Sequence, residues 1–437
     1  MHHSKSTKNL AKWLSYIESL HPKSIAMGLD RVKQMIDRLK LHPKFTIITV
    51  AGTNGKGSTC AMLEQIYTDA GYQVGCYTSP HLLRYNERVR INKQEVSDDA
   101  LCAAFAAVDA ARGEAASTDA SVDANSEIIA LTYFEVGTLA AMWHFIQTGV
   151  DVAILEIGLG GRLDAVNAFE PDCSIVTSVD LDHQEFLGNT RESIGFEKAG
   201  VYRPYVPAIC GDPNPPLSLV SFAHEVKANF KRVHHDFDFT LDGVDSWRYS
   251  AGEVAYLLPT PALKGAYQLN NAACAVCAVE SLQSQLPVTA ANIASAMHQV
   301  SLAGRFQTVS TSPHVILDVA HNPHAARALA ANLNASRTPQ GQTIAVFAML
   351  ADKDMQGVVQ AVKDEIDLWY IAGIDNVRGA AAEELAAIVS EIDPHAKFKT
   401  FSNANIAYQQ ACIDVGENDK ILVFGSFYTV ASVMQTF

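Results

Sequence analysis

The stretch that decides the fold of this chain is Phe45-Thr-Ile-Ile-Thr-Val-Ala-Gly-Thr-Asn-Gly-Lys-Gly-Ser58. Residues 45–51 form a continuous β-branched and apolar run, which is typical of a strand buried on both faces of a sheet. A glycine-rich turn follows, and residues 58–70 have a helical pattern. A buried strand, a glycine-rich turn and a helix in this order predict a phosphate-binding loop in a parallel α/β sheet.

Apolar runs of the same buried type recur downstream, with helical patterns between several of them. They lie at residues 73–77, 152–157, 173–179 and 208–210. A parallel sheet covered by helices is the natural way to bury such runs. Upstream, residues 10–41 have helical apolar spacing that is broken at Leu20-His-Pro-Lys-Ser24, which predicts two helices joined by a loop.

A second alternating series begins after the turn at Gly304. Its strands are expected at residues 315–319, 344–348, 369–372 and 421–424. At 437 residues the chain is longer than one hydrophobic core usually organises. The sequence therefore predicts an α/β protein with a P-loop mononucleotide-binding, parallel-sheet domain over residues 1–300 and a smaller Rossmann-like α/β domain over 301–437.

Bulk properties narrow the class of protein. A formal charge of −14 argues against a surface that neutralises nucleic-acid phosphates. The start of the chain does not resemble an export signal. The most apolar window, residues 128–146, contains Glu135 and His144 and is read as a buried helix rather than a membrane span. We expect a cytoplasmic protein that binds neither nucleic acid nor membranes.

Cysteines and one polar segment carry little chemistry. The eight cysteines have no framework spacing, so reduced core thiols are expected. Cys274 and Cys277 form a lone CxxC pair in a helical pattern, and no second pair completes a zinc site. Residues 112–126 are small, polar and acidic, which predicts a mobile surface insertion.

The glycine-rich turn supplies the first candidate group, Lys56. Glycines let backbone N–H groups surround a polyphosphate, and the lysine offers a cation to the β and γ phosphates. The next position, where a hydroxyl normally meets Mg²⁺, is Gly57. Another hydroxyl is therefore needed. Ser79, after the next strand, is a candidate, although an ordinary turn serine before Pro80 is the alternative reading.

Other candidate groups also follow predicted strands. Glu156 ends an apolar run, and a buried carboxylate there favours a hard cation such as Mg²⁺. Asp182 and His183 follow the next run. Lys198, beside Glu197, is by itself no more than part of a solvated helix face.

The second domain offers a comparable group of residues. Asp318 and His321 follow a buried strand, and together with Arg305 they could clamp a nucleotide across a domain cleft. Taken singly, each would be an ordinary capping or hinge residue.

The motifs of the whole chain form a specific ordered set. They are Leu-His-Pro-Lys-Ser-Ile-Ala-Met-Gly-Leu-Asp-Arg-Val, Gly-Thr-Asn-Gly-Lys-Gly-Ser, Thr-Ser-Pro-His-Leu, Thr-Tyr-Phe-Glu, Glu-Ile-Gly-Leu-Gly-Gly-Arg-Leu-Asp-Ala, Asp-His, Glu-Lys-Ala-Gly, Asn-Ala-Ala, Gly-Arg-Phe-Gln and Asp-Val-Ala-His-Asn-Pro-His. In this order they resemble the bifunctional dihydrofolate synthase/folylpolyglutamate synthase family, which is related to the muramyl-peptide ligases. The resemblance covers essentially the whole chain.

The resemblance implies an ATP-dependent carboxylate–amine ligase that adds L-glutamate to dihydropteroate and to folate γ-carboxylates through an acyl phosphate. It implies ATP and two Mg²⁺ ions as cofactors, with a monovalent cation such as K⁺ as a further one. It also implies a monomer whose partners are the small molecules dihydropteroate, tetrahydrofolates and L-glutamate.

The family's functional residues carry over to named positions. The catalytic residues implied are Lys56, His183, Lys198 and Arg305. The ATP-binding residues are Thr53, Asn54, Gly55, Lys56, Gly57, Ser58, Asn271, Arg305, Asp318 and His321. The metal ligands are Ser79, Glu156, His183 and Lys198, the last N6-carboxylated by CO₂. The pterin-binding residues are Ser19, Leu20, His21, Thr132, Tyr133, Phe134, Glu135, Leu163, Asp164 and Ala165.

Two departures leave alternatives open. Val166 stands where the family often has threonine, and the 112–126 insertion precedes Thr-Tyr-Phe-Glu. A monofunctional folylpolyglutamate synthase and another carboxylate–amine ligase of the muramyl-peptide type are the alternative enzymes. A nucleotide-binding regulator without catalysis is the alternative from another class. Five intact residues argue against it, namely Lys56, Glu156, His183, Lys198 and Arg305.

Overall fold

The structure, a computed structural model, describes residues 8–113, 128–265, 267–337 and 340–437. It divides into two compact units. The N-terminal unit comprises Met1–Ser79, Arg84–Pro259 and Ala272–Met297, and the C-terminal unit comprises Pro80–Leu83, Thr260–Asn271 and His298–Phe437. The predicted insertion at 112–126 lies almost wholly outside the described residues.

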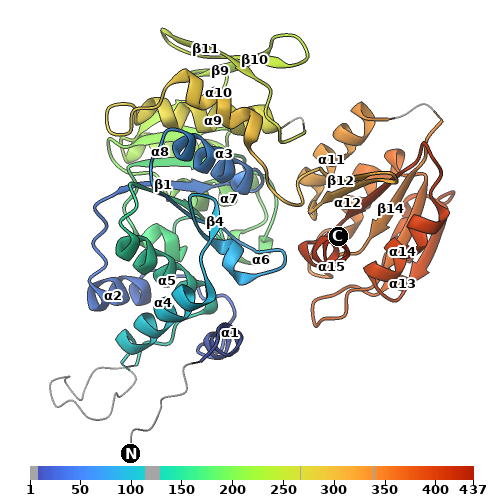
Figure 1. The fold of residues 1–437 in the computed structure, drawn as a ribbon, viewed down its shortest axis with the longest axis horizontal. Coiled ribbons are helices and arrows are strands. Elements are labelled where there is room, and N and C mark those ends of the chain that lie inside the picture. The colour runs from blue at the N-terminus through green and yellow to red at the C-terminus, as the bar shows by residue number, and fades with distance from the viewer. Residues whose placement is uncertain (1–7, 114–127, 266, 338–339) are drawn as a thin grey trace, which may run out of the picture. The chain divides into compact units, whose positions relative to one another are not determined.

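An eight-stranded sheet forms the centre of the N-terminal unit, with the strand order β4-β3-β2-β5-β1-β6-β7-β8 (Figure 1). The strands are β1 (Thr46–Ala51), β2 (Val74–Tyr77), β3 (Val89–Ile91), β4 (Gln94–Glu95), β5 (Val152–Glu156), β6 (Cys173–Val176), β7 (Pro207–Cys210) and β8 (Asn229–Arg232). The strands from β2 to β8 in this order pair in parallel. Only the β3–β4 edge is antiparallel.

Helices cover both faces of this sheet. They are α1 (Leu10–Glu18), α2 (Asp30–Leu39), α3 (Lys56–Asp69), α4 (Asp98–Ala111), α5 (Tyr133–Thr148), α6 (Gln184–Leu187), α7 (Arg191–Ala199), α8 (Leu217–Glu225), α9 (Gln268–Ser281) and α10 (Ala290–Gln299). In Figure 1, α3 lies on one side of β1 and α5 on the other. Because both faces are covered, the central strands are apolar throughout rather than alternating.

A three-stranded antiparallel sheet completes the unit. It consists of β9 (Asp238–Leu241), β10 (Ser246–Ala251) and β11 (Val254–Pro259), with β10 in the middle. The sequence did not predict it, because only alternate residues of these strands are buried, such as Trp247 and Tyr249. Such short half-polar strands give a weak pattern.

The C-terminal unit is a six-stranded sheet with the order β12-β13-β17-β14-β15-β16. Its strands are β12 (Gln307–Thr311), β13 (His314–Asp318), β14 (Thr343–Phe347), β15 (Leu368–Ala372), β16 (Phe398–Phe401) and β17 (Lys420–Phe424). Its helices are α11 (Pro323–Ala335), α12 (Met355–Val362), α13 (Ala382–Ile392), α14 (Ala404–Asp414) and α15 (Phe427–Met434). Alternate strand residues belong to two separate cores, one under α11–α13 and one under α14 and α15. This is a Rossmann-like arrangement.

The predicted fold class is confirmed. All nine predicted strands and the two N-terminal helices are present. The apolar window at 128–146 contains the buried helix α5. Cys274 and Cys277 are buried in α9 as free thiols. Within the described ranges, no helix is long and apolar enough to cross a membrane.

Ile371 tests the packing of the C-terminal unit. Its side chain is fully buried in β15, whereas Ile413 on α14 is 75% exposed. We expect Ile371→Ala to lower the free energy of unfolding by about 2–5 kcal/mol, since it leaves a cavity. Ile413→Ala should change it by less than about 0.5 kcal/mol. Urea unfolding monitored by circular dichroism measures both, and equal effects would contradict the described core.

Candidate active site

The phosphate-binding loop lies between β1 and α3, where the sequence predicts it. Gly52 and Gly55 have φ angles of 144° and 90°, which suit glycine. A Cβ atom at position 52 would also collide with Oγ1 of Thr177. The first helical hydrogen bond joins Thr59 N–H to Gly55 O (2.9 Å), so the preceding N–H groups lie at the positive end of α3. This is an anion-binding geometry.

The segment after β6 holds this loop from outside. Thr53 N–H donates to Ser178 O (2.8 Å), and Asn54 N–H donates to Ser178 Oγ (3.1 Å). Thr53 Oγ1 donates to Asp180 O and accepts from Asp180 N–H, both at 3.0 Å. Asn54 O accepts from the hydroxyls of Thr177 (2.7 Å) and Ser178 (3.0 Å). The loop is therefore shaped by a second loop, and not only by its glycines.

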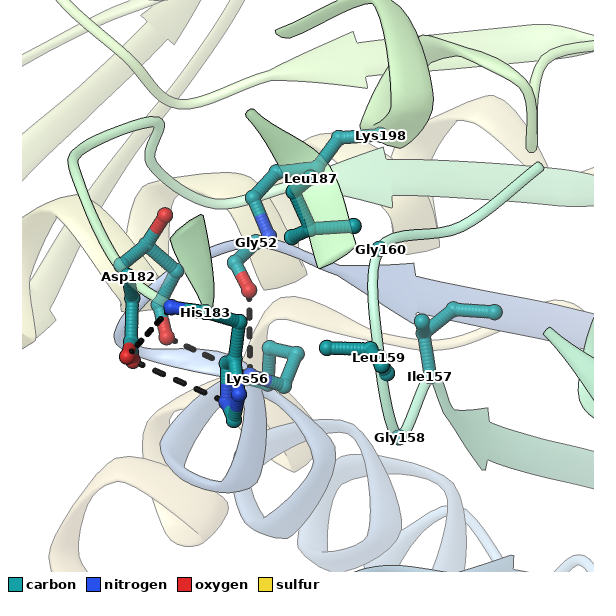
Figure 2. A pocket seen from close by; sticks show the side chains of 11 residues that line it. Gly52, Lys56, Ile157, Gly158, Leu159, Gly160, Asp182, His183, Leu187 and Lys198 are labelled. Carbon is teal, nitrogen blue, oxygen red and sulfur yellow. Dashed lines mark hydrogen bonds and ion pairs between the residues drawn. The ribbon is translucent and has the colours of Figure 1, made fainter. Parts of the chain in front are cut away.

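Lys56 lies at the mouth of the loop. Its Nζ donates to Gly52 O at 3.0 Å and to Thr53 O at 3.3 Å. Figure 2 shows it facing a pocket lined by Gly52, Thr53, Lys56, Ile157, Gly158, Leu159, Gly160, Asp182, His183, Leu187 and Lys198. The pocket brings together Lys56, His183 and Lys198 of the predicted catalytic set.

Lys198 is an unusual member of this pocket. It lies on α7 and is only 4% exposed. In the part of the chain that the structure describes, its ammonium has no hydrogen-bond or ion-pair partner. Burial lowers the pKa of Lys198 to about 7, and the nearby positive charge of Lys56 acts in the same direction. Near neutral pH a large share of this side chain is a neutral amine.

The Gly-Gly-Arg turn after β5 fixes the position of Lys198. A Cβ atom at Gly161 would lie 2.7 Å from the Glu197 carbonyl oxygen, and one at Gly200 would collide with Arg162. Arg162 N–H donates to the Glu197 carbonyl (2.8 Å), and its guanidinium pairs with the Glu197 carboxylate (2.8 Å). The glycines thus let the turn pack directly against the end of α7.

Ser79 and Glu156 lie next to each other at the ends of neighbouring parallel strands. Ser79 N–H donates to Glu156 Oε2 at 3.1 Å. Glu156 ends β5, is 5% exposed and directly precedes Ile157 of the pocket lining. The predicted hydroxyl and carboxylate therefore come from the same sheet edge, which is where parallel sheets collect ligands.

His183 has an uncommon backbone conformation. Its φ angle of 50° is left-handed, and it caps the short helix α6. Its N–H donates to Asp182 Oδ1 (2.8 Å), and its Nε2 lies 3.9 Å from Asp182 Oδ2. A non-glycine residue in this region is strained, and such residues concentrate at functional sites.

Four of the predicted pterin residues, Thr132 to Glu135, form the start of α5. Thr132 and Glu135 form a capping box, in which each side chain accepts the other residue's N–H. The Glu135 carboxylate also pairs with Arg31 of α2 at 2.7 Å. Phe134 packs so closely on Gly158 that a Cβ atom there would lie 2.6 Å from its ring. Glu135 and Arg31 therefore fix where Tyr133 and Phe134 stand.

Asp164 organises the turn that carries Leu163 and Ala165. Its carboxylate accepts N–H bonds from Gly158 (3.1 Å), Leu159 (2.9 Å) and Val166 (3.0 Å). Burial nevertheless raises the pKa of Asp164 to about 7, against these three hydrogen bonds and the charge of Lys56.

The remaining pterin candidates lie in the loop after α1. Ser19 caps the end of this helix and is exposed. Leu20 follows it, and His21 Nδ1 is 2.9 Å from the Lys23 carbonyl oxygen. Leu163, farther along the chain, accepts the N–H of Gly28 at 3.2 Å.

In the C-terminal unit, Asp318 ends β13 and accepts N–H bonds from Phe306 and Ala320, both at 2.8 Å. Burial raises its pKa, while Arg305 opposes that shift. The Arg305 guanidinium lies 5.3 Å from the Phe427 ring centre.

The other ATP candidates associated with the C-terminal unit are also held by neighbours. The His321 ring contacts the Val319 carbonyl oxygen at 2.8 Å. Asn271, on α9, is 4% exposed and donates to Gln268 Oε1 at 3.1 Å.

Comparisons with known proteins show the family of the chain. Residues 304–427 match the family model described as Mur ligase, glutamate ligase domain. The chain is 44% identical to the dihydrofolate synthase/folylpolyglutamate synthase of Escherichia coli strain K12 over 428 residues, covering 98% of this chain and 95% of that protein. It is 39% identical to the Haemophilus influenzae protein of the same name, with coverages of 98% and 97%. The chain belongs to the dihydrofolate synthase/folylpolyglutamate synthase family.

Solved structures of this family superpose over nearly the whole chain. Escherichia coli FolC in complex with DHPP and ADP has a TM-score of 0.90 at 43% identity, covering 98% of this chain and 97% of that one. A Yersinia pestis bifunctional folylpolyglutamate synthase/dihydrofolate synthase complexed with AMPPNP and Mn ion has a TM-score of 0.88 at 44% identity, with 98% of each chain covered. The chain is thus an ATP-dependent ligase, a dihydrofolate synthase/folylpolyglutamate synthase.

Sequence reasoning missed the groups that act through the backbone. Thr177, Ser178 and Asp180 hold the phosphate loop, whereas the sequence predicts a role only for Asp182 and His183, which lie just beyond them. Arg31 lies within the first family motif but was given no role. A short run of hydroxyl and acidic residues directly after a buried strand, here Thr177-Ser-Val-Asp180, was the available signal.

Asp164 makes stability depend on pH. Its folded-state pKa of about 7 is above the ordinary value of 3.8. Its stabilising contribution is therefore fully present below about pH 4 and is lost as pH rises through about 7. We expect the difference in unfolding free energy, wild type minus Asp164→Asn, to fall between pH 5 and pH 8. Urea titrations at both pH values measure it, and a difference that is constant or rises with pH would be contrary evidence.

Proposed function

We propose that both ligations of this enzyme run at one site around the phosphate loop, each through an acyl phosphate. The observation that carries the proposal is the pocket that joins Lys56, His183 and Lys198 to the loop and to the end of β5. A carboxylate is a poor acyl donor because oxide is a poor leaving group. Transfer of the γ-phosphoryl group makes phosphate the leaving group instead, after which the amine of L-glutamate can attack.

The chain's own residues supply most of what this transfer needs. The N–H groups at the start of α3 would bind the ATP phosphates, with contacts from Thr53, Asn54, Gly55, Gly57 and Ser58. Lys56 would neutralise the charge that otherwise repels the attacking carboxylate. His183 and Lys198 would complete the catalytic set in the N-terminal unit.

The proposed metal site takes two Mg²⁺ ions. In the residue ranges described, no three His, Cys, Asp or Glu side chains could hold a metal by themselves. Ser79, Glu156, His183 and Lys198 fit only if Lys198 is converted to a carbamate, since an ammonium repels a cation. Bound Mg²⁺ would neutralise phosphate charge and orient the γ-phosphoryl group. A monovalent cation such as K⁺ is a further proposed cofactor.

Carboxylation of Lys198 is supported by its surroundings. A buried amine with no partner in the described ranges is costly, and reaction with CO₂ would replace it by an anionic oxygen ligand. Hard cations prefer such oxygen ligands.

The substrate site is proposed at the start of α5 and the turn after β5. Phe134 and Tyr133 are held there by the Glu135–Arg31 pair, and Asp164 shapes the facing turn. Ser19, Leu20, His21, Thr132, Leu163 and Ala165 complete the proposed pterin set. The proposed substrates are dihydropteroate, tetrahydrofolates and L-glutamate. Val166 offers no hydroxyl group beside Ala165 in this site.

The C-terminal residues have a proposed role in closing the site. With a domain boundary between residues 300 and 301, the second domain would close over ATP and glutamate. Asn271, Asp318 and His321 would bind ATP, and Arg305 would stabilise charge during phosphoryl transfer, a kind of contribution that reaches about 10³-fold or more elsewhere. We propose a monomeric, cytoplasmic enzyme.

One assay tests the two activities together. Phosphate release is measured with ATP, Mg²⁺ and either dihydropteroate or tetrahydrofolate, each with and without L-glutamate. We expect sustained release with both acceptors only when glutamate is present. Glutamate-dependent release with tetrahydrofolate but not with dihydropteroate would indicate a monofunctional enzyme. Release with neither acceptor would contradict folate ligation and direct the search to other carboxylate substrates.

Replacement of Lys198 by Ala tests the carbamate. We expect a loss of activity of about 10²-fold, comparable to the loss of a metal-site partner, and partial recovery with added acetate or propionate. Lys420→Ala is the matched control, because Lys420 is also buried but donates to Ser336 O at 2.6 Å. It should lower the melting temperature without any effect of added carboxylate. Unchanged activity of Lys198→Ala, with and without carboxylates, would refute the assignment.

A further inference from the structure

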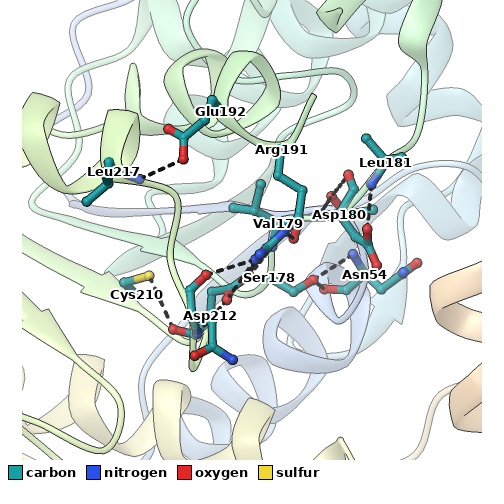
Figure 3. Close-up of polar contacts among 12 residues, drawn as sticks. Asn54, Ser178, Val179, Asp180, Leu181, Arg191, Glu192, Cys210, Asp212 and Leu217 are labelled. Atoms are coloured by element: carbon teal, nitrogen blue, oxygen red, sulfur yellow. Dashed lines mark hydrogen bonds and ion pairs between the residues drawn. The ribbon is translucent and has the colours of Figure 1, made fainter. Parts of the chain in front are cut away.

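The backbone of Val179 is held at both its N–H and its carbonyl group. Its N–H donates to Asp212 Oδ2 at 2.7 Å. Its carbonyl accepts from Arg191 Nε at 2.9 Å. The same two side chains pair with each other, because Arg191 Nη2 lies 3.1 Å and 3.0 Å from the two Asp212 carboxylate oxygens (Figure 3). Val179 is thus enclosed in a closed ring of hydrogen bonds.

The residues on either side of Val179 are those that hold the phosphate loop. Ser178 bonds with Thr53 and Asn54, and Asp180 bonds with Thr53. Figure 3 shows the contact of Asn54 with Ser178 and the contacts among Val179, Asp212 and Arg191, and the covalent backbone between Ser178 and Val179 connects the two sets. Any displacement of the Val179 peptide therefore shifts the loop's supports.

The ring also joins three elements that the active site depends on. Asp212 follows β7 and has a side chain that is 6% exposed, so few other donors reach it. Arg191 is the first residue of α7. Lys198 lies seven positions after Arg191, which is about two helical turns, so both lie on one face of α7. The next residue of α7, Glu192, accepts the N–H of Leu217 at 3.0 Å and so holds the start of this helix from another direction.

We propose that Asp212 and Arg191 are positioning residues that hold the phosphate loop in its ATP-binding shape through the Val179 peptide. Neither side chain lines the pocket, so they act on ATP only through Ser178 and Asp180. The inference rests on the proposed role of the loop as the ATP phosphate site. Loss of the Asp212 carboxylate would remove the charged acceptor of the Val179 N–H. It would also leave the Arg191 guanidinium with only two carbonyl acceptors, those of Val179 and Asn214, and the segment would relax.

The test measures ADP binding by calorimetry and the KM values for ATP and L-glutamate in the full chain. Asp212→Asn keeps the shape but removes the charge, and Arg191→Ala removes both donors. We expect each to weaken ADP binding and raise KM for ATP by about tenfold, as loss of a supporting partner commonly does. KM for glutamate should stay within about twofold. Arg191→Lys keeps a cation without the two-way geometry and should fall between wild type and Arg191→Ala.

Asp109→Asn is the matched control. Asp109 pairs with Arg112 at 2.7 Å. The Asp109 side chain is 11% exposed, similar to the 6% of Asp212, and the Arg112 side chain is 5% exposed. Neither contacts the phosphate loop. It should lower the melting temperature and leave KM for ATP unchanged. If KM for ATP rose equally in this control, the effect would follow general destabilisation and the inference would be overturned.

The remaining outcomes are also decisive. If Asp212→Asn does not fold, Arg191→Ala decides, because its side chain is 41% exposed and tolerates replacement. Folded variants that bind ADP as tightly as wild type overturn the inference alone. Failure of the wild-type chain itself to bind ADP would overturn the proposed phosphate site and, with it, this inference.

Discussion

The active site depends on one constraint: a loop that binds phosphate with its own backbone cannot use those groups to hold itself in shape. In this chain the support comes from the segment after β6. Ser178 and Asp180 form hydrogen bonds with the polar groups of Thr53 and Asn54 that do not face the start of α3. Position 52 requires glycine, because the Thr177 side chain occupies the space that a Cβ atom would need. The loop and its support are therefore a single structure made from two distant parts of the sequence.

The register of the parallel sheet carries this structure to the other candidate residues. Val50 pairs with Glu156, and Ala51 pairs with Val176. The phosphate loop, the proposed metal carboxylate and the supporting segment thus leave the sheet at the same level. Ser79 reaches Glu156 because β2 is the other neighbour of β5. A slip of one residue in any of these strands would turn its side chains to the opposite face and separate the set.

Local patterns predicted the parts of this molecule whose physics is local. The strand, loop and helix at 45–70 combine a buried run, required glycines and a helix start, and each signal supports the others. The sequence did not predict β3, β4 and β8 of the first sheet, the antiparallel strands β9–β11, or the edge strands β12 and β16. Half-buried or polar strands of this kind owe their pairing to distant neighbours. Lys56 could be assigned from its motif. Asp212 could not, since it acts on a main-chain N–H rather than on a recognisable sequence partner.

Two buried lysines show what distinguishes a structural group from a chemical one. Lys420 is 2% exposed, and its ammonium donates to the Ser336 carbonyl oxygen, which offsets part of the cost of its burial. Lys198 is 4% exposed, faces the charge of Lys56 and, within the described ranges, has no such partner. Packing alone would favour an apolar residue at that position, because an isolated buried amine lowers stability. The close glycine contacts at Gly161 and Gly200 nevertheless hold it there. A fold that maintains an unfavourable amine beside its phosphate loop is best explained by chemistry at that amine.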